Sequence, residues 1–215
     1  MNKTIPLILI YLFLISCSDN EVVRSYWDNG NLKSELRYKD GMLDGDCCWY
    51  FSNGKPEMKA RYSANVIEGE VLRWYENGNI QSRYYIKNDQ YDSIFESYNV
   101  FGDLIKVEHY EEGVLDGEFK QWYDSGKIFT EGQYKDGMIH GKWMMYYEEG
   151  NVGSIATYQN GEGLQKGYSP DGILVTEIHY ADNVKDGEEI QYNKDGSVKK
   201  ILMWESGEFV KIINK

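Results

Sequence analysis

The chain has 215 residues, with 35 acidic and 23 basic side chains, and its formal net charge is −12. This balance argues against a nucleic-acid-binding protein and against binding to anionic lipid headgroups, because both partners require a cationic surface. The acidic residues could form a recognition site. The simpler interpretation is that they keep a protein with an uncovered β-sheet face soluble and prevent its self-association.

The first 16 residues have the pattern of a secretory signal peptide. Lys3 supplies one positive charge, and an apolar run extends from Ile5 to Ile15. This run is shorter than the roughly 20 residues that a membrane-spanning helix needs. Residues 14–17 (Leu-Ile-Ser-Cys) resemble the lipobox, at which bacterial signal peptidase cuts before a diacylated cysteine. An ordinary signal peptide and an uncleaved anchor are the alternatives.

We therefore expect lipidation at Cys17, with residues 1–16 removed, a short tether over residues 17–25 and a repeat array over residues 26–215. Several acyl chains on one residue hold a protein firmly, at about 0.8 kcal/mol per buried CH₂. The acidic residues just after the cysteine resemble the surface-export signals of some bacterial lipoproteins. The expected location is the cell envelope, at the outer membrane, on either its periplasmic or its surface side.

Glycines recur at a nearly fixed interval along the remaining chain. Six of the seven intervals equal 24 residues and one equals 22, in the series Gly30, Gly54, Gly78, Gly102, Gly126, Gly150, Gly172 and Gly196. Four residues before each glycine stands an aromatic residue, in the series Tyr26, Tyr50, Trp74, Tyr98, Trp122, Tyr146, Tyr168 and Tyr192. Self-similarity of this length indicates a repeat array.

Inside a unit the apolar residues alternate with polar ones. Leu32, Ser34, Leu36 and Tyr38 would share one face of a strand, because side chains of a strand alternate between its faces. Dipeptides such as Asn29-Gly30 favour tight hairpin turns, because a positive φ costs glycine little. Each unit is therefore predicted as a strand, a tight turn, a second strand and a second turn that contains glycine.

Eight such units predict an all-β fold: an elongated, twisted antiparallel β-meander of about eight hairpin repeats and sixteen short strands. Strand spacings of about 4.8 Å give a sheet roughly 75–80 Å long. An array of this kind has no central pocket for a catalytic site. We therefore expect function on an extended surface.

Three irregularities interrupt the pattern. Asp89 and Ser93 replace the two glycines of one second turn. After Gly102, Lys106 and Glu108 fall on the core side of the strand, which predicts either a β-bulge that flips the register or a weak seam between sub-arrays. The 22-residue interval is explained by a shortened second turn over residues 160–163.

The combined pattern resembles the unit of the MORN repeat variant family. The segment Trp-Tyr-Asp-Ser-Gly-Lys-Ile at residues 122–128, followed by Tyr-Lys-Asp-Gly-Met-Ile-His-Gly at residues 134–141, carries the resemblance. It extends from about Tyr26 to Trp204. The resemblance implies hairpin arrays used for scaffolding, dimerisation and protein or membrane contact. It also implies an alternative, because bacterial members are commonly described as YwqK-type antitoxins: an immunity protein that neutralises a cognate toxin.

No pattern in the sequence predicts catalysis, a cofactor or a metal site. His109 and His179 occupy the same repeat position about 30 Å apart in the predicted sheet, so they cannot share a metal. Cys47 and Cys48 are adjacent on a strand and point to opposite faces. We interpret them as one buried and one surface thiol, in preference to a redox or metal pair. We expect no enzyme, and glycan hydrolysis ranks last because no suitable carboxylate pair is evident.

Aromatic doublets predict the candidate binding surface. The two rings of a doublet would lie on opposite faces of the first strand of a unit. The face opposite the repeat aromatics would carry Trp49, Phe51, Tyr75, Phe119, Tyr123, Trp143 and Tyr147. Such an aromatic-polar groove suits a protein partner; alternatively, coiling of the sheet buries both faces. The favoured function is a non-enzymatic interaction scaffold whose only membrane contact is its N-terminal lipid.

Overall fold

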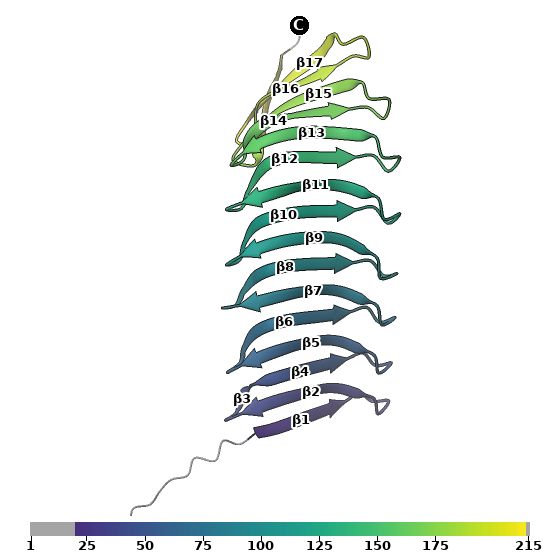
Figure 1. The fold of residues 1–215 in the computed structure, drawn as a ribbon, viewed down its shortest axis with the longest axis vertical. Helices are drawn as coiled ribbons and strands as arrows, with labels where there is room; N and C mark the ends of the chain where they lie inside the picture. Colours follow the sequence, from purple (N-terminus) through teal and green to yellow (C-terminus); the bar gives the residue numbers. More distant parts are fainter. Residues whose placement is uncertain (1–19, 214–215) are drawn as a thin grey trace, which may run out of the picture.

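The computed structural model describes residues 20–213, so the predicted signal peptide and the predicted lipidation site at Cys17 lie outside the described residues. Within this range the chain is all-β and forms a single antiparallel sheet of 18 strands (Figure 1). The predicted fold class is confirmed. Among these residues no helix has the length and apolarity needed to cross a bilayer.

The strands follow one another along the stack in chain order (Figure 1). Their bounds are β1 (Asn20–Tyr26), β2 (Leu32–Lys39), β3 (Met42–Leu43), β4 (Gly45–Tyr50), β5 (Pro56–Ser63), β6 (Val66–Trp74), β7 (Ile80–Lys87), β8 (Gln90–Tyr98), β9 (Leu104–Glu111), β10 (Val114–Trp122), β11 (Ile128–Lys135), β12 (Met138–Tyr146), β13 (Val152–Gln159), β14 (Glu162–Tyr168), β15 (Leu174–Ala181), β16 (Val184–Tyr192), β17 (Val198–Glu205) and β18 (Glu208–Ile213).

Each strand pairs with its sequence neighbours, and β3 and β4 together act as one interrupted partner of β2. Strand β1 pairs with β2 from Asn20, which lies opposite Lys39, to Tyr26. The expectation of a tether over residues 17–25 is therefore wrong for residues 20–25, which are part of the sheet. Sequence reasoning missed this strand because it precedes the first complete glycine-centred unit.

The two turns of a unit have different geometries. In the first turn, Gly30 donates its N–H to the carbonyl of Trp27 at 2.8 Å, and Gly30 alone has a positive φ, of 87°. This is a three-residue loop that ends in a left-handed glycine. The second turn is the two-residue type, with positive φ at both central residues, as in Asp40 (52°) and Gly41 (79°). The tight two-residue hairpin therefore lies at the second turn, not at Asn29-Gly30 as predicted.

A β-bulge follows nearly every second turn. In the pair β11–β12, Glu131 lies opposite Met144 while Gln133 lies opposite His140, so β12 has two extra residues there. Gly141, with a φ of 68°, stands in this bulge. The pair β13–β14 has no such shift and runs in one register from Ser154 to Gln159. The two residues missing from the 22-residue interval are therefore those of the bulge.

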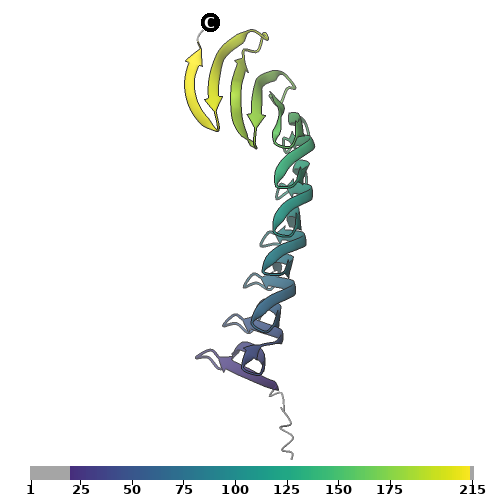
Figure 2. The same ribbon diagram turned by 90° about the vertical axis from the view of Figure 1, so that its left-hand side faces the viewer.

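The array changes direction near this shortened hairpin. Seen from the side, the strands up to β13 stack as a narrow column, whereas the C-terminal strands turn out of it (Figure 2). Asn183, in the β15–β16 turn, bridges the recess left by the short turn. Its side-chain amide donates to the carbonyl of Gly137 at 3.0 Å, and its side-chain oxygen accepts from the N–H of Ile139 at 2.8 Å.

The irregular fourth unit keeps its register, so neither the bulge that flips the register nor the seam is present. Asp89 and Ser93 adopt positive φ values of 60° and 64° and thus take over the glycine conformations. Strand β9 pairs with both β8 and β10. Lys106 and Glu108 do lie on the core side, where they form an ion pair at 3.0 Å.

Candidate interaction surface

One face of the sheet, here called the core face, contains most of the buried strand residues. Its central row runs straight across neighbouring strands through Cys47, Ala60, Val71, Tyr84 and Phe95. Cys47, Ala60 and Val71 are fully buried. Because Cys47, Ala60 and Val71 are small, the aromatic side chains beside them on the core face can cover this row. The single sheet thus has buried residues without a second layer of structure.

The aromatic residues of the core face pack against one another. Phe119 stacks on Trp143 with ring centroids 5.5 Å apart, and both contact Tyr134 edge-on. Trp49 packs beside Tyr62. The sequence placed Trp49, Phe119 and Trp143 on the face opposite the core, and this placement is wrong. The cause is the bulge beside the first turn, which puts the repeat aromatics, not these rings, on the other face.

The phenols of the core face are poor acid-base groups. Burial raises the pKa of Tyr110 to about 12. Burial also raises the pKa of Tyr134, Tyr158 and Tyr180. These hydroxyls therefore remain protonated over the physiological range. Among residues 20–213 no group of three or more His, Cys, Asp or Glu side chains could hold a metal.

The other four predicted surface residues lie in the first turns and not on a strand. Tyr75, Tyr123 and Tyr147 each follow the last residue of a strand. Each donates its hydroxyl to a main-chain carbonyl of the next unit, with oxygen–oxygen distances of 2.9, 2.8 and 2.7 Å. Phe51 occupies the same position without a hydroxyl. The seven predicted residues are therefore not one stripe, and these tyrosines tie one repeat to the next.

The opposite face, here called the outer face, carries a half-exposed apolar band. We define the aromatic band as the eight repeat aromatics: Tyr26, Tyr50, Trp74, Tyr98, Trp122, Tyr146, Tyr168 and Tyr192. Tyr26 is exposed and the other seven are half-buried. Because each first turn shifts the register, the residue two after each glycine lies opposite its aromatic, as Leu32 does for Tyr26. The aromatic band and these aliphatic residues run together along the outer face.

Charged side chains of the outer face pair across neighbouring strands. Arg83 binds Glu96 at 2.7 Å, and Lys166 binds Glu177 at 3.1 Å. The carboxylates also accept hydrogen bonds from the aromatic band, since Tyr98 donates to Glu96 at 2.8 Å. The Arg83 hydrogen bond lowers the pKa of Glu96. Because these charges already bind one another, they are less available to bind a protein partner. The aromatic rings are therefore the main contact area of the outer face.

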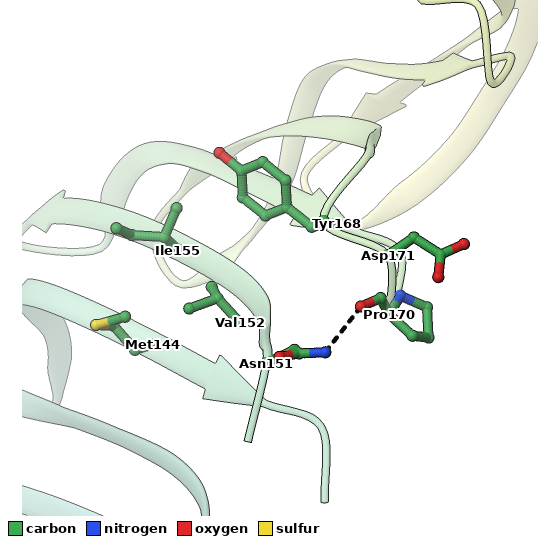
Figure 3. Close-up of a pocket in the computed structure, with 8 residues that line it drawn as sticks. Met144, Asn151, Val152, Ile155, Tyr168, Pro170 and Asp171 are labelled. Carbon is green, nitrogen blue, oxygen red and sulfur yellow. Dashed lines mark hydrogen bonds between the residues drawn. The ribbon is translucent and has the colours of Figure 1, made fainter. Parts of the chain in front are cut away.

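A hollow of about 490 Å³ opens in the aromatic band between β12 and the β14–β15 turn (Figure 3). Its apolar lining comes from Met144, Val152, Ile155, Tyr168 and Pro170. Sequence reasoning missed it. The available signal was Ile155, which stands five residues after its glycine, where the units centred on Gly126 and Gly172 have a glutamate.

The two cysteines lie as predicted, Cys47 buried on the core face and Cys48 half-buried, and both are free thiols. The pKa of Cys47 is raised by burial, so the thiol is unreactive. His109 and His179 lie on separate strands, β9 and β15.

Comparison with known families matches the MORN repeat variant over six segments, residues 22–40, 43–64, 67–88, 115–136, 139–160 and 161–182, together more than half of the chain. The irregular fourth unit lies in the unmatched gap. No curated protein matches. One solved structure with similarity is "Crystal Structure of TcdB2-TccC3", at 12% identity and a TM-score of 0.22, covering 88% of this chain. The present chain spans only 15% of that chain's length.

Proposed function

Because the chain belongs to the MORN repeat variant family, we propose that it is a non-enzymatic scaffold that binds a protein partner in the bacterial cell envelope. Repeats of this family generally mediate contacts with proteins or membranes and are typically non-catalytic. The proposal adds the partner class, the binding face and the location.

The observation that carries the proposal is the aromatic band on an open sheet. The accessible surface is 14334 Å² for a mass of 25.1 kDa, whereas a compact protein of this mass exposes about 10,000 Å². A half-exposed row of Tyr and Trp offers contact area with little loss of side-chain entropy on binding. We place the interface on the outer face, and we replace the predicted seven-residue stripe with the aromatic band.

The binding face is tested by photocrosslinking. A benzophenone amino acid is placed at Trp74 or Trp122 of the aromatic band, and at Met42 or Val114, the strand residues directly after two second turns, as controls. Met42 and Val114 are 40% and 45% exposed, so they report on contacts elsewhere. We expect crosslinks to one discrete protein from the aromatic band only. Crosslinks from the second turns alone would contradict the proposed face.

The location rests on Cys17. We propose that its lipid is the only membrane contact, since the acidic chain disfavours anionic headgroups. Metabolic labelling with a fatty-acid analogue should mark the wild type and fail with Cys17→Ser, which should also move the protein from the membrane to the soluble fraction. A C17S protein that stays membrane-bound would show a different anchor.

The second candidate is an antitoxin or immunity protein, favoured by the net charge of −12, which would complement a basic toxin. The signal sequence requires that such a toxin act in the envelope. An adjacent gene for a secreted protein whose toxicity is suppressed by co-expression would support this candidate. The candidate would be contradicted if the gene had no such neighbour, or if co-expression of this protein gave no protection from the products of the neighbouring genes.

A further inference from the structure

We propose that the hollow beside Ile155 is the anchor pocket of the interface, and that it takes an aromatic or branched aliphatic side chain from a basic segment of a protein partner. This inference rests on the proposed function, because it names one recognition point within the aromatic band. At this contact between units Ile155 replaces the glutamate of two other units, and an apolar hollow opens beside it.

In the units centred on Gly126 and Gly172 a glutamate occupies the place of Ile155, whereas Val107 and Ile201 stand at this place in the units centred on Gly102 and Gly196. Glu131 accepts a hydrogen bond from Tyr146 at 2.8 Å, and Glu177 accepts one from Tyr192 at 2.6 Å. Ile155 offers no such acceptor, and the hydroxyl of Tyr168 has no hydrogen-bond partner within residues 20–213. The ring of Tyr168 therefore forms an apolar side of the hollow, and its hydroxyl can bind a ligand.

The strand next to Ile155 shows the same change. Met144 lies directly opposite Ile155, and Glu131 lies opposite Met144 on the other side. One strand further towards the N-terminus, Lys120 of β10 lies opposite Glu131 of β11. The adjacent hollow, lined by Glu118, Lys120 and Glu131, is accordingly polar. The hollow beside Ile155 is therefore apolar, whereas the adjacent one is polar.

The size of the hollow suits a protein side chain. Its volume of about 490 Å³ falls within the range of about 300–1,000 Å³ that is common for binding sites. Burial of one Leu or Phe side chain contributes about 1.5–3 kcal/mol. The hydroxyl of Tyr168 and the amide of Asn151 lie beside the apolar floor (Figure 3), although the Asn151 amide already donates to the carbonyl of Pro170 at 3.0 Å.

The charge around the hollow defines the flanks of the occupant. Asp171 is the one charged residue in its lining, and no lysine or arginine lines it. Glu148 and Glu149, both exposed, stand in the neighbouring turn. Lys166 lies directly opposite Ile155, but it is bound to Glu177 at 3.1 Å. The three carboxylates form no ion pair within residues 20–213, so they are the charges that the residues flanking an entering apolar side chain would meet. Lysine or arginine flanks are therefore favoured and acidic flanks are repelled.

The test titrates the full-length protein with three capped peptides: Lys-Leu-Phe-Arg, Glu-Leu-Phe-Asp and Lys-Ser-Ser-Arg. The readout is the methionine methyl NMR spectrum. We expect the first peptide to shift the Met144 methyl signal and the other two to leave it unchanged. Equal binding of the first two peptides, or a first peptide that shifts only other methionines, would overturn the inference.

Two variants make the result specific to the hollow. Ile155→Glu restores the residue found at Glu131 and Glu177, so the fold should accept it, and it should weaken peptide binding at least about tenfold, which is 1.4 kcal/mol. The double substitution K120M/E131I should create a second apolar hollow and a second binding event. A folded I155E protein that still binds the peptide as the wild type does would overturn the inference.

The inference and the proposed function can fail separately. If the peptides do not bind but crosslinks from Trp74 and Trp122 still capture a partner, the anchor pocket is wrong and the scaffold stands. If the aromatic band yields no crosslink and no peptide binds, both are wrong.

Discussion

The hairpins β11–β12 and β13–β14 differ by two residues, and this difference coincides with the change of direction of the whole array. The first contains the bulge at Gly141, and the second runs in one register. Bulges bend and twist a sheet locally. Regular use of the bulge gives a straight column, and its single omission accompanies the turn near β14 (Figure 2).

The side-chain bridges between turns show the same contrast. In the column, Asn65 accepts a hydrogen bond from the N–H of Leu43, in the turn directly before its own. Asn183 instead reaches Ile139, two turns back, across the shortened one. Asn65 and Asn183 occupy the same repeat position, but Asn183 binds one turn further back. The turn between Asn183 and Ile139, at residues 160–161, is therefore set back from its neighbours. The shape of this array is therefore set by the presence or absence of the bulge in each hairpin.

Insertion of two residues near the start of β14, where β12 has its bulge, should have the largest effect. The insertion restores the 24-residue interval and allows the bulge, so we expect the C-terminal strands to rejoin the column. Small-angle scattering should then give a maximum dimension closer to the roughly 75–80 Å expected from strand spacings of about 4.8 Å. The bridge from Asn183 to Gly137 and Ile139 would be lost.

The control is Asn183→Ala, which removes that bridge but keeps the short turn. It should lower stability by about 1–2 kcal/mol, for two lost hydrogen bonds, and leave the scattering profile unchanged. An N183A protein that straightens would show that the bridge, and not the missing bulge, sets the bend.

Most of the fold was predictable, because glycine spacing and two-residue alternation report directly on local backbone geometry. The 22-residue interval correctly indicated a shortened hairpin, but the two missing residues belong to the bulge and not to the two-residue turn. Its consequence for direction was not predictable, because a change of angle depends on how bulges in successive hairpins add up. The assignment of faces was wrong for a related reason: a one-residue shift beside each first turn moves the repeat aromatics, such as Tyr50, to the outer face.

The candidate surface was predictable in kind but not in detail. Sequence reasoning found that aromatic residues matter, yet it placed Trp143 outside and gave Tyr147 no structural role. Trp143 packs on Phe119, and Tyr147 binds the carbonyl of Tyr168. Contacts between repeats are invisible when each unit is considered alone. The hollow at Ile155 is lined by residues of neighbouring units, so no single unit predicts it.

Two glycines test how tightly each region is packed. In the turned region, a Cβ on Gly163 would lie 2.5 Å from the main-chain oxygen of Thr157. In the column, a Cβ on Gly132 would overlap the indole of Trp143, a side chain packed against Phe119 and Tyr134, and would meet no main-chain atom among its nearest contacts. Gly163→Ala should therefore cost more than Gly132→Ala, within about 1–3 kcal/mol for overpacking. Urea denaturation measures both; equal costs would show that the short hairpin is no tighter than the column.

A buried carboxylate in the turned region gives a smaller, pH-dependent effect. Burial of Glu189 opposes its ionisation, but hydrogen bonds from Lys185, Gln191 and Trp204 hold its pKa below the usual value of 4.5. The ionised form therefore stabilises the fold above the unfolded pKa, and this contribution is lost as the pH falls through the lower folded pKa. Glu189→Gln should cost about 1–2 kcal/mol at pH 7 and flatten the acid side of the profile. If the free energy of unfolding of Glu189→Gln and of the wild type fell equally steeply as the pH is lowered below about 4.5, the assignment would be contradicted.

The smallest effect is expected at the irregular fourth unit of the column. Ser93 adopts a φ of 64° in the bulge where β12 has Gly141, and a left-handed conformation costs a residue with a Cβ about 1–2 kcal/mol. Glycine loses more backbone entropy on folding, which offsets part of this gain. Ser93→Gly should therefore raise the unfolding free energy by about 0.5–1 kcal/mol. The matched change Ser97→Gly, in the same strand without a positive φ, should destabilise it. If both variants lose stability, the serine conformation carries no strain, and the fourth unit differs from its neighbours in sequence alone.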